Sequence, residues 1–125
     1  MILDTCAVLW LAEGSRDLTE GTVERIRQTP VVYLCAISGF EIAIKVAKRK
    51  LELPLPPHDW FVKTIEHHDL TVLFLDLDLC ISSAELPRVH SDPCDRLIIA
   101  AAKRDNLTVV TADPRFVKYG VTVII

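Results

Sequence analysis

Features that mark membrane-spanning or disordered proteins are scarce in this sequence. No apolar run approaches the roughly 18 residues that a bilayer crossing needs, and runs such as residues 31–37 and 97–102 are far shorter. The chain has only four glycines and a net charge of −3, which excludes the low-complexity and highly charged disordered classes. Its 125 residues are 50% hydrophobic. We therefore expect residues 1–125 to form one compact domain with its own core.

The N-terminus does not have the pattern of a secretory signal. Asp4 interrupts the first apolar residues, and no basic region precedes them. The apolar stretch that follows Asp4 is also short. We therefore expect a cytoplasmic protein without a membrane anchor.

The sequence also has no cysteine pair with the two-residue spacing of a zinc knuckle. Most of the cysteines have apolar neighbours in sequence, so we expect buried free thiols that pack as small hydrophobic side chains. Two of the four histidines, His67 and His68, are adjacent, and adjacent residues on a helix point in different directions. These patterns disfavour a zinc site. The four cysteines are Cys6, Cys35, Cys80 and Cys94.

The alternation of apolar runs with amphipathic segments predicts an α/β domain. Strands are expected at residues 1–3, 31–36, 71–75, 108–111 and 121–125, and helices at residues 6–13, 19–28, 38–50, 60–68, 79–86 and 92–104. The uninterrupted apolar run at 31–36 is typical of a strand that is buried on both faces. Ser38 and Glu41 have the spacing of a capping box, and Asp92 before Pro93 is typical of a helix start. The order of elements predicts a three-layer α/β/α domain with a mostly parallel central sheet.

Four acidic residues follow the expected strands or lie in the first turns of the expected helices. In a parallel sheet, the carboxyl ends of the strands and the N-termini of the helices that follow them meet at one edge, where ligands bind. Crowded carboxylates repel one another and raise one another's pKa unless a cation neutralises them. Oxygen ligands suit Mg²⁺ or Mn²⁺, so we predict that the four acids form a site for such an ion. They are Asp4, Glu41, Asp95 and Asp113.

Three of these acids have a structural alternative. Glu41 could complete a helix cap, Asp95 could interact with its helix dipole, and Asp113 could initiate a turn. Asp4 has no such alternative, because it ends a strand that is expected to be central.

Hydroxyl and basic residues are expected beside the acids. The hydroxyls can hydrogen bond to carboxylates or to metal-bound water, and we predict this supporting role for Thr5, Ser38 and Thr111. Setting the four acids aside from the 17 acidic residues leaves 13 against 14 basic ones, so the remaining surface can meet a polyanion. The basic residues predicted to contact the phosphate groups of such a polyanion are Lys45, Arg96, Arg115 and Lys118.

Four segments make the sequence similar to a known family: residues 3–10 (LDTCAVLW), 38–45 (SGFEIAIK), 91–100 (SDPCDRLIIA) and 111–116 (TADPRF). In content, order and spacing, they resemble the PIN-domain ribonucleases, specifically the VapC-type toxins of bacterial toxin-antitoxin modules. The resemblance implies a PIN-like fold and a Mg²⁺- or Mn²⁺-dependent endoribonuclease. It assigns the acidic cluster to Asp4, Glu41, Asp95 and Asp113. It also implies a cognate VapB-type antitoxin and either a homodimer or a toxin–antitoxin hetero-oligomer.

In the reaction we expect, Asp4, Asp95 and Asp113 hold the principal ion, and Glu41 holds a second ion or aligns water. Two alternatives remain open. A non-catalytic PIN-fold module that binds protein or RNA would need no stoichiometric metal at the acidic edge. A phosphoryl-transfer or receiver domain with Asp4 as nucleophile usually has a second acid two residues later, where this sequence has Cys6.

Overall fold

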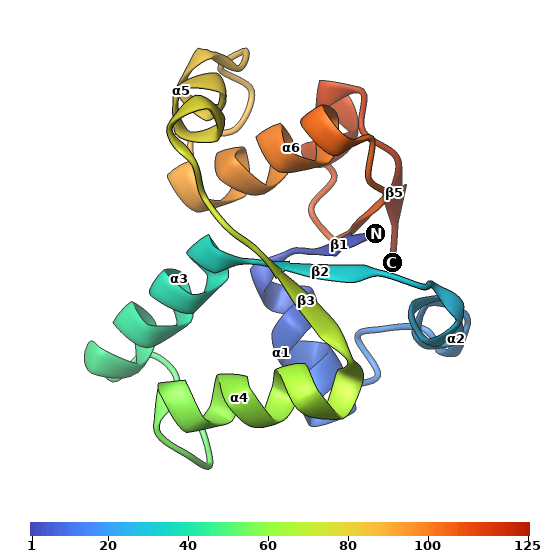
Figure 1. Ribbon diagram of the computed structural model, residues 1–125, viewed down its shortest axis with the longest axis vertical. Helices are drawn as coiled ribbons and strands as arrows, with labels where there is room; N and C mark the ends of the chain where they lie inside the picture. Colours follow the sequence, from blue (N-terminus) through green and yellow to red (C-terminus); the bar gives the residue numbers. More distant parts are fainter.

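A five-stranded parallel sheet lies at the centre of the computed structural model, which describes residues 1–125 (Figure 1). Its strands are β1 (Ile2–Leu3), β2 (Val32–Cys35), β3 (Leu70–Leu73), β4 (Val109–Val110) and β5 (Val123–Ile124). They lie in the order β3-β2-β1-β4-β5, and every neighbouring pair is parallel. The prediction of a mostly parallel sheet is therefore confirmed, with β1 as the central strand.

Helices cover both faces of the sheet. They are α1 (Thr5–Glu13), α2 (Glu20–Gln28), α3 (Ala36–Ala47), α4 (Pro57–His68), α5 (Leu77–Glu85) and α6 (Pro93–Asp105), with a short 3₁₀-helix η1 (Phe116–Tyr119). In Figure 1, α5 and α6 lie on one side of the strands and α1 to α4 on the other. The three-layer α/β/α arrangement is thus confirmed. None of the helices combines the length and the apolar composition that crossing a membrane would require.

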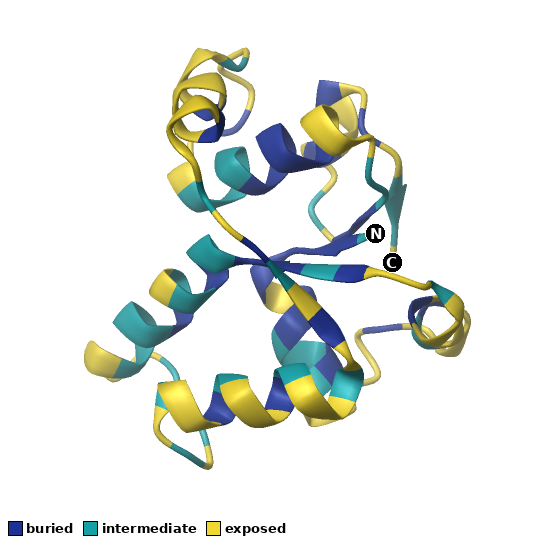
Figure 2. Ribbon diagram, in the orientation of Figure 1, coloured by how far each residue is buried: buried dark blue, intermediate teal, exposed yellow.

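The sheet separates two apolar cores. Both residues of β1 are fully buried: Ile2 packs into the core beneath α6, and Leu3 packs into the core beneath α1. This alternation follows from the period of two in a strand, because successive side chains point to opposite faces. Figure 2 shows the buried residues along the strands and on the inner sides of the helices. A strand of two residues is therefore held firmly enough to position the residue that follows it.

Two predicted helix starts have different outcomes. Asp92 caps α6, because its Oδ1 accepts the backbone N–H of Cys94 at 2.8 Å. The predicted capping box at Ser38 and Glu41 is wrong, because α3 begins two residues earlier, at Ala36. Ser38 therefore lies inside the helix, and its hydroxyl bonds to a residue on α1.

The prediction for the cysteines is correct in one respect and wrong in another. All four are free, but only Cys35 is buried, and Cys6 and Cys80 are exposed. Cys6 lies in the first turn of α1 and Cys80 lies in α5, and other residues of these two helices are the buried ones. Apolar neighbours in sequence therefore did not determine the burial of a helical residue, because each turn presents a different face to the core.

The topology creates a crevice at one edge of the sheet. Chain connections run from β1 toward β2 and β3 on one side, whereas β4 and β5 lie on the other side of β1. At such a switch point the connections leave the strands in opposite directions, and ligands bind outside the carboxyl ends of the strands. Asp4 directly follows β1, and Thr111 directly follows β4.

Candidate metal centre

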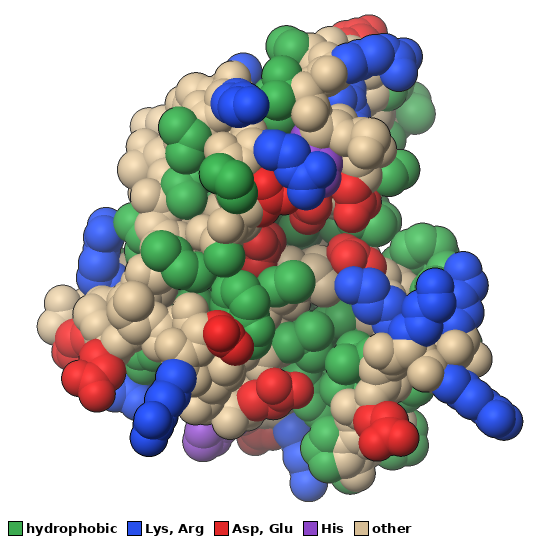
Figure 3. Space-filling model, turned by 180° about the vertical axis from the view of Figure 1, so that it is seen from behind, with side chains coloured by type: hydrophobic (Ala, Val, Ile, Leu, Met, Phe, Trp, Pro, Cys, Tyr) green, Lys and Arg blue, Asp and Glu red, His purple; other side chains and the backbone are tan.

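The four predicted acids meet at this crevice from four different segments. Asp4 follows β1, Glu41 lies in α3, Asp95 lies in the first turn of α6, and Asp113 follows β4. Their charges act on one another, since Glu41 and Asp113 both raise the pKa of Asp4. Figure 3 shows acidic side chains gathered in a hollow of the rear face, with a histidine and basic side chains beside them.

Asp4 is the most buried of the acids, with 6% of its surface exposed. Its Oδ1 accepts the backbone N–H of Ala7 at 2.7 Å, so it caps α1. Burial raises the pKa of Asp4, although hydrogen bonds from Thr111 and from the Ala7 N–H act in the opposite direction. Asp4 therefore combines a structural role, which the sequence analysis did not identify, with a place in the acidic cluster.

Glu41 is held by a chain of two hydroxyls and by a lysine. The Thr5 hydroxyl donates to Glu41 Oε2 at 2.8 Å and lies 2.9 Å from the Ser38 hydroxyl. Because the only hydroxyl hydrogen of Thr5 is donated to Glu41, the Ser38 hydroxyl donates to the Thr5 hydroxyl oxygen. Lys45 Nζ lies 3.2 Å from Glu41 Oε1. One carboxylate oxygen thus faces the hydroxyl pair and the other faces the lysine.

Asp113 forms an ion pair with an arginine two residues later. The Arg115 guanidinium donates to both oxygens of Asp113, and the shortest of these bonds, from Nη2 to Oδ2, is 2.6 Å. These bonds lower the pKa of Asp113 to about 2, although burial acts in the opposite direction. The Asp113 N–H donates to the Thr111 hydroxyl at 3.0 Å. A cation that approaches Asp113 would therefore compete with Arg115.

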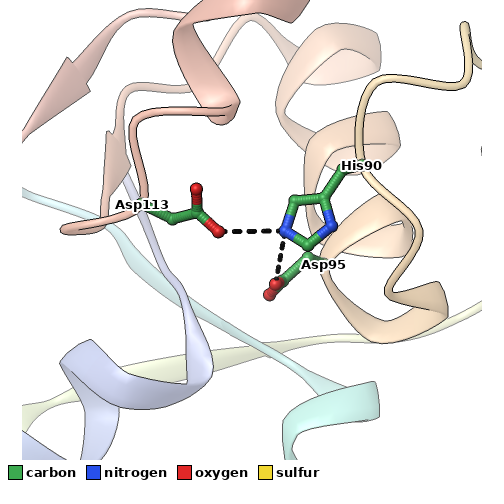
Figure 4. A group of neighbouring side chains, drawn as sticks. All are labelled: His90, Asp95 and Asp113. Atoms are coloured by element: carbon green, nitrogen blue, oxygen red, sulfur yellow. Dashed lines mark hydrogen bonds and ion pairs between the residues drawn. The ribbon is translucent and has the colours of Figure 1, made fainter.

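The negative charge of Asp95 is less stabilised than that of Asp113. Burial, and then repulsion from Asp92, raise the pKa of Asp95 to about 7, although His90 acts in the opposite direction. His90 Nε2 lies 2.9 Å from Asp95 Oδ2 and 3.0 Å from Asp113 Oδ2 (Figure 4). These three residues are the one group of ligand-type side chains whose atoms all lie within 4.8 Å of one another. Asp4 and Glu41 lie at the same crevice but outside this tight group.

His90 is a site residue that the sequence analysis missed. The available signal was its position in the loop before α6, two residues ahead of the cap Asp92 and five ahead of Asp95. Chain proximity places it near Asp95, but only the fold brings it to Asp113.

The basic residues predicted to contact RNA occupy different settings. Lys45 and Arg115 pair with acids of the cluster, and Lys118 lies in η1 and makes no ion pair. Arg96 instead turns toward the protein's own backbone, which gives it a structural role, and its contact with RNA stays a prediction. Its guanidinium donates to the carbonyls of Ala84, Leu86, Pro87 and His90 and to the Tyr119 hydroxyl.

The chemistry of the crevice fits a divalent cation. Burial raises the pKa of both Asp4 and Asp95, so a cation that neutralised them would stabilise their ionised forms. The donors are carboxylate oxygens, which suit hard ions such as Mg²⁺ or Mn²⁺. The thiol of Cys94 nearby is a poor ligand, because burial raises its pKa to about 11.

Asp95 makes the stability of the metal-free protein depend on pH. The ordinary pKa of an aspartate is 3.8, whereas that of Asp95 is raised to about 7. The unfolded chain therefore loses this proton at lower pH than the folded protein, and stability falls as pH rises between these values. In chelator, we expect the melting temperature to fall by on the order of 5 °C between about pH 5 and pH 7.5.

Asp113 does not obscure this measurement. Its lowered pKa of about 2 contributes stability that is lost only as pH falls below the ordinary value for aspartate. In Asp95→Asn, the melting temperature should change little between about pH 5 and pH 7.5. If it falls as steeply as in the wild type, the pH dependence belongs to another group.

Comparison with known proteins places this chain among similar sequences and folds. A sequence model of the PIN domain family matches residues 1–121. Ribonuclease VapC22 of Mycobacterium tuberculosis (strain ATCC 25618 / H37Rv) is 26% identical over 116 residues, which cover 92% of this chain and 88% of that protein.

Solved structures share the fold at lower sequence identity. VapBC2 from Rickettsia felis, bound to a DNA fragment from its promoter, matches with a TM-score of 0.73 at 16% identity, covering 98% of this chain and 96% of that chain. VapC20 of Mycobacterium tuberculosis, a Sarcin-Ricin loop cleaving toxin, matches with a TM-score of 0.63 at 19% identity, covering 97% of this chain and 95% of that chain. The fold of this chain is thus the fold of these proteins along almost its whole length.

Proposed function

The chain belongs to the PIN domain family, and on that premise we propose that it is a metal-dependent endoribonuclease, the toxin of a VapC-type toxin–antitoxin module. The observation that carries the proposal is the convergence of four carboxylates, from four separate segments, at the switch point of the sheet. A ribonuclease among the sequence relatives and an RNA-cleaving toxin among the structural neighbours support it.

We propose that the buried and half-buried acids are the metal ligands. Asp4, Asp95 and Asp113 hold a Mg²⁺ or Mn²⁺ ion, and Glu41 holds a second ion or aligns the attacking water. When bound, the ion lowers the pKa of water and stabilises the charge that develops on the phosphoryl and leaving oxygens. The protein's own role is to hold the carboxylate oxygens of these four acids in place.

Three hydroxyl groups help to hold the acids of the cluster in place. Thr5 donates to one oxygen of Glu41, and Ser38 orients Thr5. Thr111 hydrogen bonds to Asp4 and accepts the N–H of Asp113. Thr111 therefore links the carboxylate of Asp4 to the backbone of Asp113.

Basic side chains at the rim would contact the RNA backbone. Lys45 and Arg115 have side chains that are 42% and 48% exposed, and Lys118 lies just beyond them in η1. Such contacts neutralise phosphates without reading bases. The Arg115 guanidinium, which pairs with Asp113, would also suit a phosphate oxygen.

A cognate VapB-type antitoxin is the partner that we propose. The solved relative from Rickettsia felis is VapBC2 bound to a DNA fragment from its promoter, and a further structural neighbour is a toxin–antitoxin complex. The Arg115–Asp113 pair illustrates how a guanidinium supplied by a partner could neutralise the cluster in place of the cation. We propose a cytoplasmic protein that forms a homodimer or a toxin–antitoxin hetero-oligomer.

Metal removal tests the proposed function. With a mixed RNA substrate, we expect cleavage in Mg²⁺ or Mn²⁺, loss of cleavage on addition of a chelator, and recovery when the ion is restored in excess. The readout is the appearance of new RNA ends by sequencing. Full cleavage in chelator would refute the metal mechanism. Absence of both stoichiometric Mn²⁺ binding and RNA cleavage would favour the non-catalytic interaction module.

A further inference from the structure

His90 lies in the loop between α5 and α6, and its side chain is 2% exposed. Its ring packs edge-on against Phe116, with the ring centroids 6.0 Å apart and the planes at 83°. The Tyr119 hydroxyl accepts the His90 N–H at 2.7 Å, and Arg96 donates to the His90 carbonyl at 3.0 Å. Both the ring and the backbone of this residue are therefore fixed.

The hydrogen bonds of the ring determine which nitrogen carries the hydrogen. The backbone N–H of Asp92 donates to His90 Nδ1 at 3.1 Å. A nitrogen that accepts a hydrogen bond carries no hydrogen itself, so the ring hydrogen is on Nε2. This tautomer is set by the first turn of α6, because Asp92 is the residue that caps that helix.

The Nε2–H group points between two acids of the cluster. It lies 2.9 Å from Asp95 Oδ2 and 3.0 Å from Asp113 Oδ2, so both carboxylates can accept from it (Figure 4). A histidine that ligates a metal through Nε2 must present a lone pair there. In His90 the free lone pair is on Nδ1 and faces the backbone of the protein.

We propose that His90 is a positioning residue, whose Nε2–H shared by Asp95 and Asp113 holds the two carboxylates in the orientation that binds the metal. It is not itself a ligand. The inference rests on the proposed function, because it concerns the same site. Hydrogen bonds that orient metal ligands typically change metal affinity by about 10- to 100-fold when they are removed.

Two variants of His90 separate the hydrogen bond from the bulk of the ring. The side-chain nitrogen of Gln can take the place of Nε2 as a donor, whereas the shorter Asn places its nitrogen near Nδ1. We expect His90→Asn to bind Mn²⁺ about 10- to 100-fold more weakly than the wild type. His90→Gln should bind within a few-fold of the wild type. The measurement is Mn²⁺ titration followed by electron paramagnetic resonance, with melting curves to confirm folding.

A measurement on the unsubstituted protein tests the same inference without any variant. In ¹⁵N-labelled protein at about pH 7.5, we expect nuclear magnetic resonance to find the His90 hydrogen on Nε2 both without and with saturating Mg²⁺. Transfer of that hydrogen to Nδ1 on Mg²⁺ binding would make His90 a ligand and overturn the proposal.

The outcomes distinguish this inference from the proposed function. Mn²⁺ binding that depends on His90, without cleavage of any RNA, would overturn the proposed function alone. Wild-type Mn²⁺ affinity in His90→Asn would overturn the inference alone. Failure of the wild type to bind Mn²⁺ would overturn both.

Discussion

Asp95→Asn will remove RNA cleavage while leaving the protein folded. The substitution takes one anionic ligand from the cluster, and a metal-held transition state loses several kcal/mol of charge stabilisation with it. We expect the cleavage rate in Mg²⁺ to fall at least about 100-fold. In chelator at neutral pH, the melting temperature should rise, because a carboxylate whose pKa burial has raised to about 7 is replaced by a neutral amide.

Asp92→Asn provides the matched control for this variant. Asp92 lies three residues earlier and caps α6 through the N–H of Cys94. Asparagine caps helices about as well as aspartate, so cleavage should stay within a few-fold of the wild type. Undiminished cleavage by Asp95→Asn, or an equal loss in both variants, would contradict the assignment of Asp95 as a ligand.

Arg96→Met will destabilise the protein, because it keeps an unbranched apolar side chain but removes the guanidinium group. The Arg96 guanidinium joins the end of α5 to the loop that carries His90, through hydrogen bonds to four backbone carbonyls. Methionine offers no donor, so these acceptors lose partners that carried a charge. We expect the free energy of unfolding, measured by urea titration, to fall by about 3 kcal/mol.

Arg104→Met is the comparison for this second prediction. Arg104 lies on the same helix and pairs with Asp76 and Asp105, but these contacts are at the surface. Exposed ion pairs contribute little, so its loss should cost less than about 1 kcal/mol. Equal destabilisation by the two variants would show that Arg96 has no special structural role.

The order of the elements could be predicted from the sequence because it depends on local patterns. The apolar run at 31–36 became β2, and the Asp92-Pro93 pair marked the start of α6. The observed ends of the strands and helices differ from the predicted ends by a few residues. For example, α4 begins at Pro57 rather than at residue 60, since proline is tolerated in the first helical turn.

The approach of the four acids to one crevice could also be predicted. Parallel strands send their carboxyl ends to the same edge, so Asp4 after β1 and Asp113 after β4 had to be neighbours once the sheet was parallel. Periodicity and topology contain this information, and neither requires knowledge of side-chain contacts.

Only the tertiary structure decided which side chains meet inside that crevice. His90 bonds to Asp113 across 23 residues, and Ser38 bonds to Thr5 across 33. Arg96 follows Asp95 directly in sequence but turns to the backbone of another loop. The sequence alone determined the layers, the sheet and the edge where the acids gather, because those depend on local hydrophobic periodicity. Hydrogen-bond partners depend on how separate elements pack, and no local pattern encodes that.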